Sequence, residues 1–316
     1  MQAIRDVGER FCLRRLFALF LFVLFLQQIK QKAVSAPRCA LAFLKIVCLA
    51  DNRSQNRTVN GFFREIFMFK KTLLFAAAGA MLAASAATQA EELVMGTEST
   101  YPPFEYVDTK NGSEVIGFDV DMIRLIGQKA GFTVKIASMG FDALIPAILG
   151  KQIDIAGAAV SITEERAKKV SFTDPYYDSG LSILVRKADK DVYKTDKDLQ
   201  NKIICGQIGN SGMAYAKTIP GAKTKTFNTM NEAYMELRNN GCAAVIGDRP
   251  TIGYFMASNP RNAKIFSHQS QILNVEQFGF IVAKNNKALL DRMNKALREA
   301  KQDGSYQAVM TKWFGQ

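Results

Sequence analysis

The 316-residue sequence is poor in the side chains that bind metal ions, with one histidine, His268, and five cysteines. No spacing among them is typical of a metal site, so we expect neither a metal nor another cofactor. Three of the cysteines precede residue 91, and only Cys205 and Cys242 follow it. In an exported domain these two would form one disulfide, and otherwise they would be buried thiols. The sequence leaves both alternatives open.

Residues 91–316 carry nearly equal numbers of positive and negative side chains. The formal net charge is +12, but residues 1–90 hold 13 Lys or Arg against 4 Asp or Glu. Residues 91–316 hold 28 and 25, and they contain no long run of one sign. Nucleic-acid binding requires basic residues clustered on the folded surface, so we expect no nucleic-acid partner.

Hydrophobic runs long enough to cross a membrane are also missing, although two shorter ones occur near the start. Residues 68–90 join two lysines, an Ala-rich apolar stretch and a small-residue end, which predicts a secretory signal peptide. We expect cleavage after Ala90, with Ala87 as the alternative. Residues 1–67, with the other apolar run at 17–26, are interpreted as an upstream extension from a start codon assigned too early. A second membrane signal is the alternative.

After residue 90, strand-like apolar runs alternate with segments of helical periodicity, which predicts an α/β protein with mostly parallel sheets. The predicted strands are 92–96, 132–137, a short Ile-rich run that begins at 153, 181–186, 202–207, 243–246 and 275–283. The predicted helices are 117–130, 141–150, 161–166, 230–239, 287–300 and 307–314, with two more that begin near Met213 and Asp248. The pattern restarts after Asp198, which indicates two successive lobes.

Segment 153–166 connects a predicted strand to a predicted helix through small residues. Ser161 and Glu164 have the spacing of a capping box, which predicts the helix start at Ser161. A helix N-terminus offers N–H groups to an anion, and Arg166 adds a guanidinium that suits a carboxylate. We therefore predict a site for a small molecule that carries a carboxylate. An ordinary connection with a surface arginine is the alternative.

Four further positions have predicted local roles. In the proline-containing loop at 98–105, Tyr101 is expected to face a ligand and Phe104 to be buried. Asp142 and Asp248 are predicted N-caps, because each stands at the start of a predicted helix.

Several motifs of the chain together resemble the periplasmic amino-acid-binding proteins of ABC importers, in the group for polar and basic amino acids. They are Thr-Glu-Ser-Thr-Tyr-Pro-Pro-Phe-Glu (97–105), Gly-Phe-Asp-Val-Asp (117–121), Phe-Asp-Ala-Leu-Ile-Pro (141–146), Ser-Ile-Thr-Glu-Glu-Arg (161–166), Phe-Thr-Asp-Pro-Tyr-Tyr (172–177), and Asp-Gly-Ser-Tyr (303–306) leading to Lys-Trp-Phe (312–314). Each is weak alone, but together they span essentially all of residues 91–316.

The resemblance implies a two-lobed periplasmic-binding-protein fold of type II, with two mostly parallel sheets joined by two hinge strands. Residues 91–177 and 276–316 would form the first lobe. Residues 178–275 would form the second lobe, with the hinge strands at its ends. One amino acid would bind between the lobes.

The resemblance also implies roles for individual residues. Arg166 would bind the ligand α-carboxylate, assisted by the Ala159 backbone and by the hydroxyls of Ser161 and Ser211. Asp248 would bind the α-ammonium group. The remaining residues would recognise the ligand side chain. The predicted ligand-binding set is Glu98, Tyr101, Phe141, Ala159, Ser161, Arg166, Gln207, Ser211 and Asp248.

Glu98 between two aromatic rings favours a cationic ligand, with arginine first. Segments 210–212 and 230–237 resemble glutamine binders instead, so glutamine or another polar amino acid is the alternative. A sensor subunit and a cyclohexadienyl-dehydratase-like enzyme are the rival classes, and we expect no enzymatic activity. The expected partners are a free amino acid and the permease subunits of an ABC transporter. The protein is expected to be a periplasmic monomer.

Overall fold

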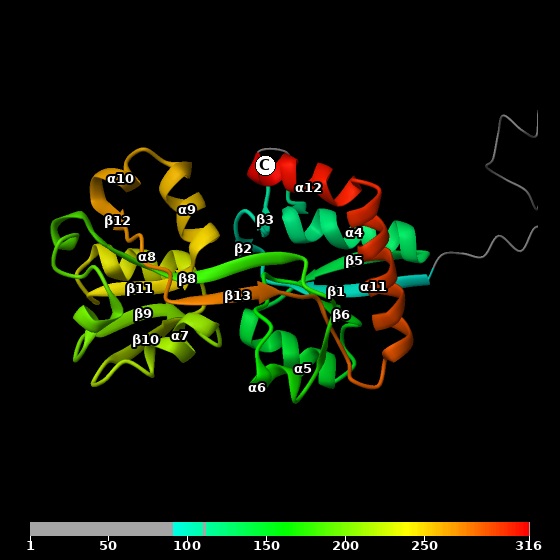
Figure 1. Ribbon diagram of the computed structural model, residues 1–316, viewed down its shortest axis with the longest axis horizontal. Coiled ribbons are helices and arrows are strands. Elements are labelled where there is room, and N and C mark those ends of the chain that lie inside the picture. The colour runs from blue at the N-terminus through cyan, green and yellow to red at the C-terminus, as the bar shows by residue number, and fades with distance from the viewer. Residues whose placement is uncertain (1–90, 110–111, 316) are drawn as a thin grey trace, which may run out of the picture. The chain divides into compact units, whose positions relative to one another are not determined.

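The computed structural model describes residues 91–109 and 112–315 (Figure 1). The predicted extension at 1–67 and the predicted signal peptide at 68–90 lie outside these residues. The described part is a mixed α/β structure with two sheet-containing lobes, as predicted. Within it, no helix combines the length and the apolar character needed to cross a membrane.

The first lobe contains a five-stranded sheet in the order β5-β1-β6-β14-β7. Its strands are β1 (Glu91–Thr97), β5 (Phe132–Ser138), β6 (Ile155–Ala156), β7 (Ser171–Phe172) and β14 (Ile281–Val282). β1 pairs in parallel with β5 and β6, whereas β14 is antiparallel to β6 and β7. A small antiparallel sheet consists of β2 (Thr100–Tyr101), β3 (Glu105–Val107) and β4 (Val115–Ile116).

Helices accompany this sheet. They are α4 (Phe118–Ala130), η1 (Phe141–Ala143), α5 (Leu144–Leu149), α6 (Glu164–Ala167), α11 (Lys287–Gln302) and α12 (Ser305–Phe314). The longest two, α4 and α11, bury apolar faces of helical period. α4 ends where the sequence predicts, because Gly131 adopts the left-handed conformation with φ 80°. α4 packs against α11, α12 and β5.

The second lobe contains a sheet in the order β10-β9-β11-β8-β12, with β13 also paired to β8. Its strands are β8 (Tyr177–Arg186), β9 (Ile203–Gln207), β10 (Lys223–Phe227), β11 (Ala244–Asp248), β12 (Phe266–His268) and β13 (Asn274–Phe278). Its helices are η2 (Lys187–Asp189), η3 (Asp196–Leu199), α7 (Ser211–Ala216), α8 (Met230–Arg238), α9 (Arg249–Ser258) and α10 (Asn262–Ile265).

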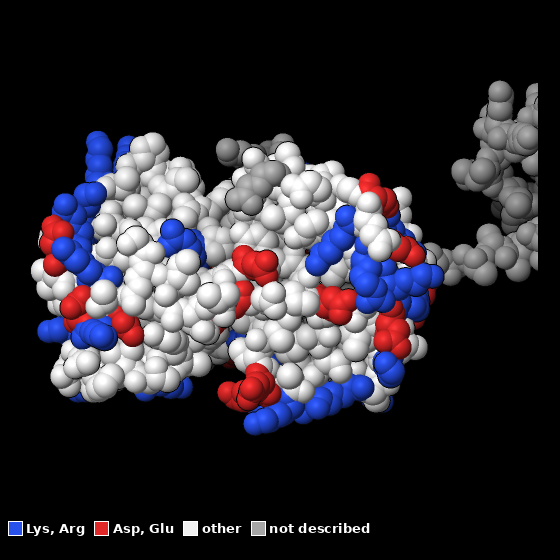
Figure 2. Space-filling view, viewed as in Figure 1, with Lys and Arg blue, Asp and Glu red and all other residues white. Residues whose placement is uncertain are grey.

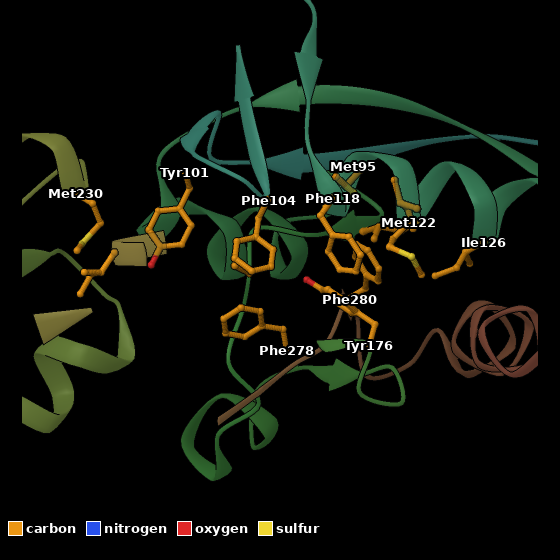
Figure 3. Packing of buried hydrophobic residues seen from close by; sticks show 14 of the residues in the cluster. Met95, Tyr101, Phe104, Phe118, Met122, Ile126, Tyr176, Met230, Phe278 and Phe280 are labelled. Atoms are coloured by element: carbon orange, nitrogen blue, oxygen red, sulfur yellow. The ribbon is translucent and has the colours of Figure 1, made fainter. Parts of the chain in front are cut away.

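Two antiparallel strands, β8 and β13, run from one lobe to the other (Figure 1). Where they enter the first lobe, Phe104 is fully buried, and its ring meets those of Phe118 and Phe278 edge-on (Figure 3). The ring of Tyr177 also meets it edge-on. The prediction that Phe104 belongs to the core is confirmed.

Acidic and basic side chains are interspersed over the viewed face of both lobes (Figure 2).

The two cysteines of this part of the chain form a disulfide, which decides between the two alternatives. Cys205 lies on β9, and Cys242 lies just before the neighbouring strand β11. Their Cα atoms are 6.0 Å apart, an ordinary separation for a disulfide.

Two predicted helix starts are wrong. The N-cap of α6 is Thr163, not Ser161, and its side chain accepts from the Arg166 N–H at 3.3 Å. Ser161 is kept in extended backbone by a bridge to Phe278 on β13, a long-range pairing that local spacing does not reveal. Asp142 lies inside η1, whose N-cap is Gly140.

Other local predictions need smaller corrections. Asp248 occupies the N-cap position of α9, but its side chain makes no capping hydrogen bond because it is bonded to Tyr101 instead. The predicted strand 275–283 is divided into β13 and β14. The short strands β2, β3, β4, β7, β10 and β12 were not predicted, because two to five residues are too few for a clear period.

Candidate functional site

A small cavity between the lobes collects nearly all of the predicted ligand-binding residues. It is lined by Tyr101, Phe141, Ala158, Ala159, Ser161, Arg166, Gln207, Asn210, Ser211 and Asp248. Of the predicted set, only Glu98 does not line it. The cavity volume is ≈ 10 Å³, about enough for one water molecule. A larger cleft of ≈ 430 Å³ adjoins it and shares Phe141 and Arg166.

Arg166 provides the positive pole of the site and connects the two lobes. Its Nη1 donates to the Ser161 carbonyl at 2.8 Å, and its Nη2 donates to the Gly209 carbonyl at 2.9 Å. The guanidinium carbon lies 5.4 Å from the centre of the Phe141 ring. Burial lowers the pKa of Arg166, while the nearby charges of Glu276 and Asp248 raise it. A guanidinium stays protonated in either case, so the group is a fixed cation.

Asp248 provides the negative pole. Tyr101 donates its hydroxyl to Asp248 Oδ2 at 2.5 Å, whereas Oδ1 has no hydrogen-bond partner among the described residues. Burial, and next the charge of Glu276, raise the pKa of Asp248 to about 7. The expectation that Tyr101 lies at the site agrees with its place on the cavity wall.

Ser161 and Ser211 both donate to the carboxylate of Glu276. Glu276 was not among the predicted site residues. The two hydroxyls donate to Glu276 Oε2 at 2.5 Å and 2.8 Å, one from each lobe. Glu276 is only 7% exposed. A signal for it exists, because Glu276 and Phe278 alternate on β13 and therefore face the same, inner side.

Ala159 lies on the cavity wall, but its backbone N–H does not point into the cavity. It donates instead to Asp119 Oδ2 at 2.8 Å. The expectation that this N–H assists a ligand carboxylate is therefore wrong for this geometry. Ala159 has a φ of 48°, in the left-handed region that few residues other than glycine adopt.

Glu98 lies behind the cavity wall, next to Gln207. It is 5% exposed, and its Oε1 accepts from the Thr100 hydroxyl. Its Oε2 has no hydrogen-bond partner in the described part of the chain. Burial raises the pKa of Glu98, and hydrogen bonds from Thr100 and Gln207 oppose this shift. The amide of Gln207 also donates to the Asn228 carbonyl at 2.9 Å.

The arrangement suits a small zwitterion. A fixed cation and a carboxylate lie on opposite lobes, and one further buried carboxylate with a free lone pair lies behind Gln207. The polar groups of the two lobes now bond to one another, so a ligand would have to replace these bonds with its own. Such an exchange costs little if the ligand offers the same donors and acceptors.

The chain is similar to proteins of one family. Residues 93–316 match the bacterial extracellular solute-binding proteins, family 3. The ABC transporter arginine-binding protein 1 of Escherichia coli (strain K12) is 32% identical over 235 residues, which are 73% of this chain and 93% of that protein. An ancestral arginine-binding protein solved with arginine has a TM-score of 0.67 at 37% identity, covering 71% of this chain and 98% of that one. An ancestral arginine-binding protein solved with glutamine gives 0.67 at 36% identity, with coverage of 71% and 98%. These similarities confirm the predicted two-lobed fold.

Proposed function

Because the chain belongs to the bacterial extracellular solute-binding proteins, family 3, we propose that it captures arginine or another cationic amino acid and delivers it to an ABC transporter. The similar proteins named above include arginine-binding proteins from a transporter and from an ancestral reconstruction. The choice of a cationic ligand rests on the residues of this chain.

The observation that carries the choice is the unpartnered oxygen of Glu98. A buried carboxylate oxygen without a donor is costly, and a cationic side chain reaching past Gln207 would supply a donor to Oε2. Tyr101 and Phe141 line the cavity in front of Glu98 and offer ring faces to a guanidinium. Such stacking contributes roughly 0.5–2 kcal/mol.

In this proposal the two poles bind the backbone of the ligand. Arg166 pairs with the α-carboxylate, and Asp248 accepts from the α-ammonium group. Because Arg166 lies on the first lobe and Asp248 on the second, one zwitterion contacts both and favours the closed form over the open one. Ser161 and Ser211 add hydroxyls if they turn from Glu276 to the ligand carboxylate.

Glutamine is the second candidate, because the amide of Gln207 lines the cavity and could pair with a ligand amide. We further propose that the protein binds its ligand without transforming it. His268, the single histidine, bonds to Ser182 on β8 and does not line the cavity, so it is not placed as a general base.

We make further proposals about export, oligomeric state and lobe boundaries. Residues 68–90 would direct export to the periplasm, and residues 1–67 would be an untranslated extension. A monomer would present its closed form to the permease subunits. We also propose the lobe boundaries given above, which fall within the two strands that connect the lobes, β8 and β13.

Calorimetric titration of the exported protein with arginine, lysine, histidine and glutamine tests the ligand class. We expect arginine to bind most tightly. Tighter binding of glutamine than of arginine would refute the cationic preference while leaving the amino-acid site intact. Binding of none of the four would refute the proposed function itself.

A further inference from the structure

Two buried carboxyl groups lie side by side beneath the ligand cavity, and the proposed function uses neither. Glu105 is on β3, and Asp119 is in the first turn of α4. Both are fully buried, and the Asp119 backbone N–H donates to the carbonyl of Phe104, the residue before Glu105, at 2.9 Å. Their chain neighbours Phe104 and Phe118 belong to the apolar core shown in Figure 3.

Several carboxyl oxygens of this pair have no hydrogen-bond donor unless one of the two groups is protonated. Asp119 Oδ2 accepts from the Ala159 N–H at 2.8 Å and from the Tyr176 hydroxyl at 2.6 Å. Among the described residues, Asp119 Oδ1 and both carboxyl oxygens of Glu105 have no donor. Two ionised carboxylates in contact in an apolar interior would repel strongly. One proton between Glu105 and Asp119 Oδ1 removes the repulsion and supplies the missing donor.

The surroundings place this proton on Glu105. Asp119 has two donors on its other oxygen and lies at a helix N-terminus, which favours a negative charge. Glu105 has neither. Burial foremost, and then the charges of Asp119, Glu98 and Asp248, raise the pKa of Glu105 well above its usual range. Burial raises the pKa of Asp119 to about 7, although its hydrogen bonds oppose the shift.

The ionised oxygen of Asp119 positions a part of the cavity wall. Ala159 adopts a left-handed conformation, which costs an alanine roughly 1–2 kcal/mol. Its N–H bond to a buried carboxylate compensates for that cost. Ala158, Ala159 and Ser161 line the cavity, so the orientation of this segment sets the shape of the wall.

The Tyr176 hydroxyl, the second donor to Asp119 Oδ2, connects Asp119 to the hinge strands. Tyr176 directly precedes β8, and its backbone N–H donates to the Phe278 carbonyl on β13 at 3.0 Å. Its ring stacks on Phe280, with the centroids 4.5 Å apart. Asp119 therefore links α4, the cavity wall and the two hinge strands through one oxygen atom.

We propose that Glu105 and Asp119 share one proton, held on Glu105, and that the ionised Asp119 positions Ala159 and with it the wall of the ligand cavity. Both are positioning residues and do not touch the ligand. The shared proton is independent of any ligand. Its effect on affinity rests on the proposed function.

Infrared difference spectroscopy of the ligand-free full-length protein tests the shared proton. At pH about 9, a carboxyl group with a pKa near 7 is ionised and only a much more basic one keeps its proton. We expect a carboxylic-acid C=O band in the wild type that disappears in Glu105→Gln and remains in Asp248→Asn and Glu98→Gln. Absence of the band, or its persistence in Glu105→Gln, would overturn the shared proton.

Ligand titration of two substitutions at Glu105 tests the positioning role. Glu105→Gln can still donate to Asp119, so its arginine affinity should stay within about threefold of the wild type. Glu105→Leu leaves Asp119 Oδ1 without a donor, and its affinity should fall by about 10-fold or more. Equal affinities of the two variants would overturn the positioning role. If Glu105→Leu does not fold, Glu105→Gln still decides, because a loss of more than 10-fold there contradicts the proposal.

Discussion

Replacing Glu98 by glutamine separates recognition of the ligand side chain from recognition of its backbone. The substitution keeps the size of the side chain and its contacts with Thr100 and Gln207 but removes the negative charge. Glu98 does not line the cavity, whereas Arg166 and Asp248 do, so the two poles should be unaffected. Only a ligand with a cationic side chain should therefore lose affinity.

The magnitude follows from the burial of the group. A hydrogen bond to a charged partner contributes roughly 1.5–3 kcal/mol, which corresponds to about 10- to 100-fold in Kd. Burial raises the pKa of Glu98, so ionising it for the ligand has a cost, and the lower half of this range is expected. Glutamine carries no net charge, and its affinity should change by less than about threefold.

The assay is calorimetric titration of arginine and of glutamine into the wild type and Glu98→Gln. Glu114→Gln is a matched control, because Glu114 is exposed and paired with Arg124 on the surface. The control should bind both ligands as the wild type does. An unchanged arginine affinity in Glu98→Gln, or an equal loss for both ligands, would refute the assignment of Glu98 to the ligand side chain.

Four further predictions test other parts of the account. Arg166→Met should weaken arginine binding by at least about 10- to 100-fold. Lys169→Met, at an exposed residue paired with Glu165, should leave arginine binding unchanged, and titration of both variants would show this. Asp248 pairs with an α-ammonium group as an ionised carboxylate, and the pKa values of Asp248 and of Asp119, which positions the cavity wall, are both about 7, so arginine affinity should fall below pH 7 and level off above it; a flat profile from titrations across this range would contradict both assignments. Cys205→Ala/Cys242→Ala removes a cross-link between residues 37 apart and should lower the free energy of unfolding by about 2–4 kcal/mol, which urea unfolding would measure; an unchanged value would count against the bond. Gly117→Ala should destabilise the fold more than Gly304→Ala in the same assay: both have a positive φ, which residues other than glycine rarely adopt, but only at Gly117 would the new Cβ lie 2.0 Å from a carbonyl oxygen, that of Phe104.

The longer helices and strands of the fold were predictable, because their signals are local. The apolar period of α4 and the glycine that ends it are adjacent in the sequence, and both are found as predicted. The N-cap of α6 was not predictable, because the bridge between Ser161 and Phe278 joins segments more than a hundred residues apart. Local spacing alone favoured Ser161 over Thr163.

The same distinction applies to the candidate site. Most of the predicted residues meet at one cavity, because the family motifs that suggested them span both lobes. Glu276 and Asp119 escaped attention because their importance comes from partners far along the chain, the two serines and the Ala159 N–H. The assistance expected from that N–H could be corrected only once its acceptor was seen.

The central claim is that Arg166 binds the α-carboxylate of an amino acid. Its most direct test is calorimetric titration with agmatine, which is arginine without that carboxylate, into the wild type and Arg166→Met. We expect agmatine to bind the wild type at least about 100-fold more weakly than arginine does. We also expect that Arg166→Met does not weaken agmatine binding any further. Agmatine binding as tight as that of arginine, or an additional loss in Arg166→Met, would contradict the account.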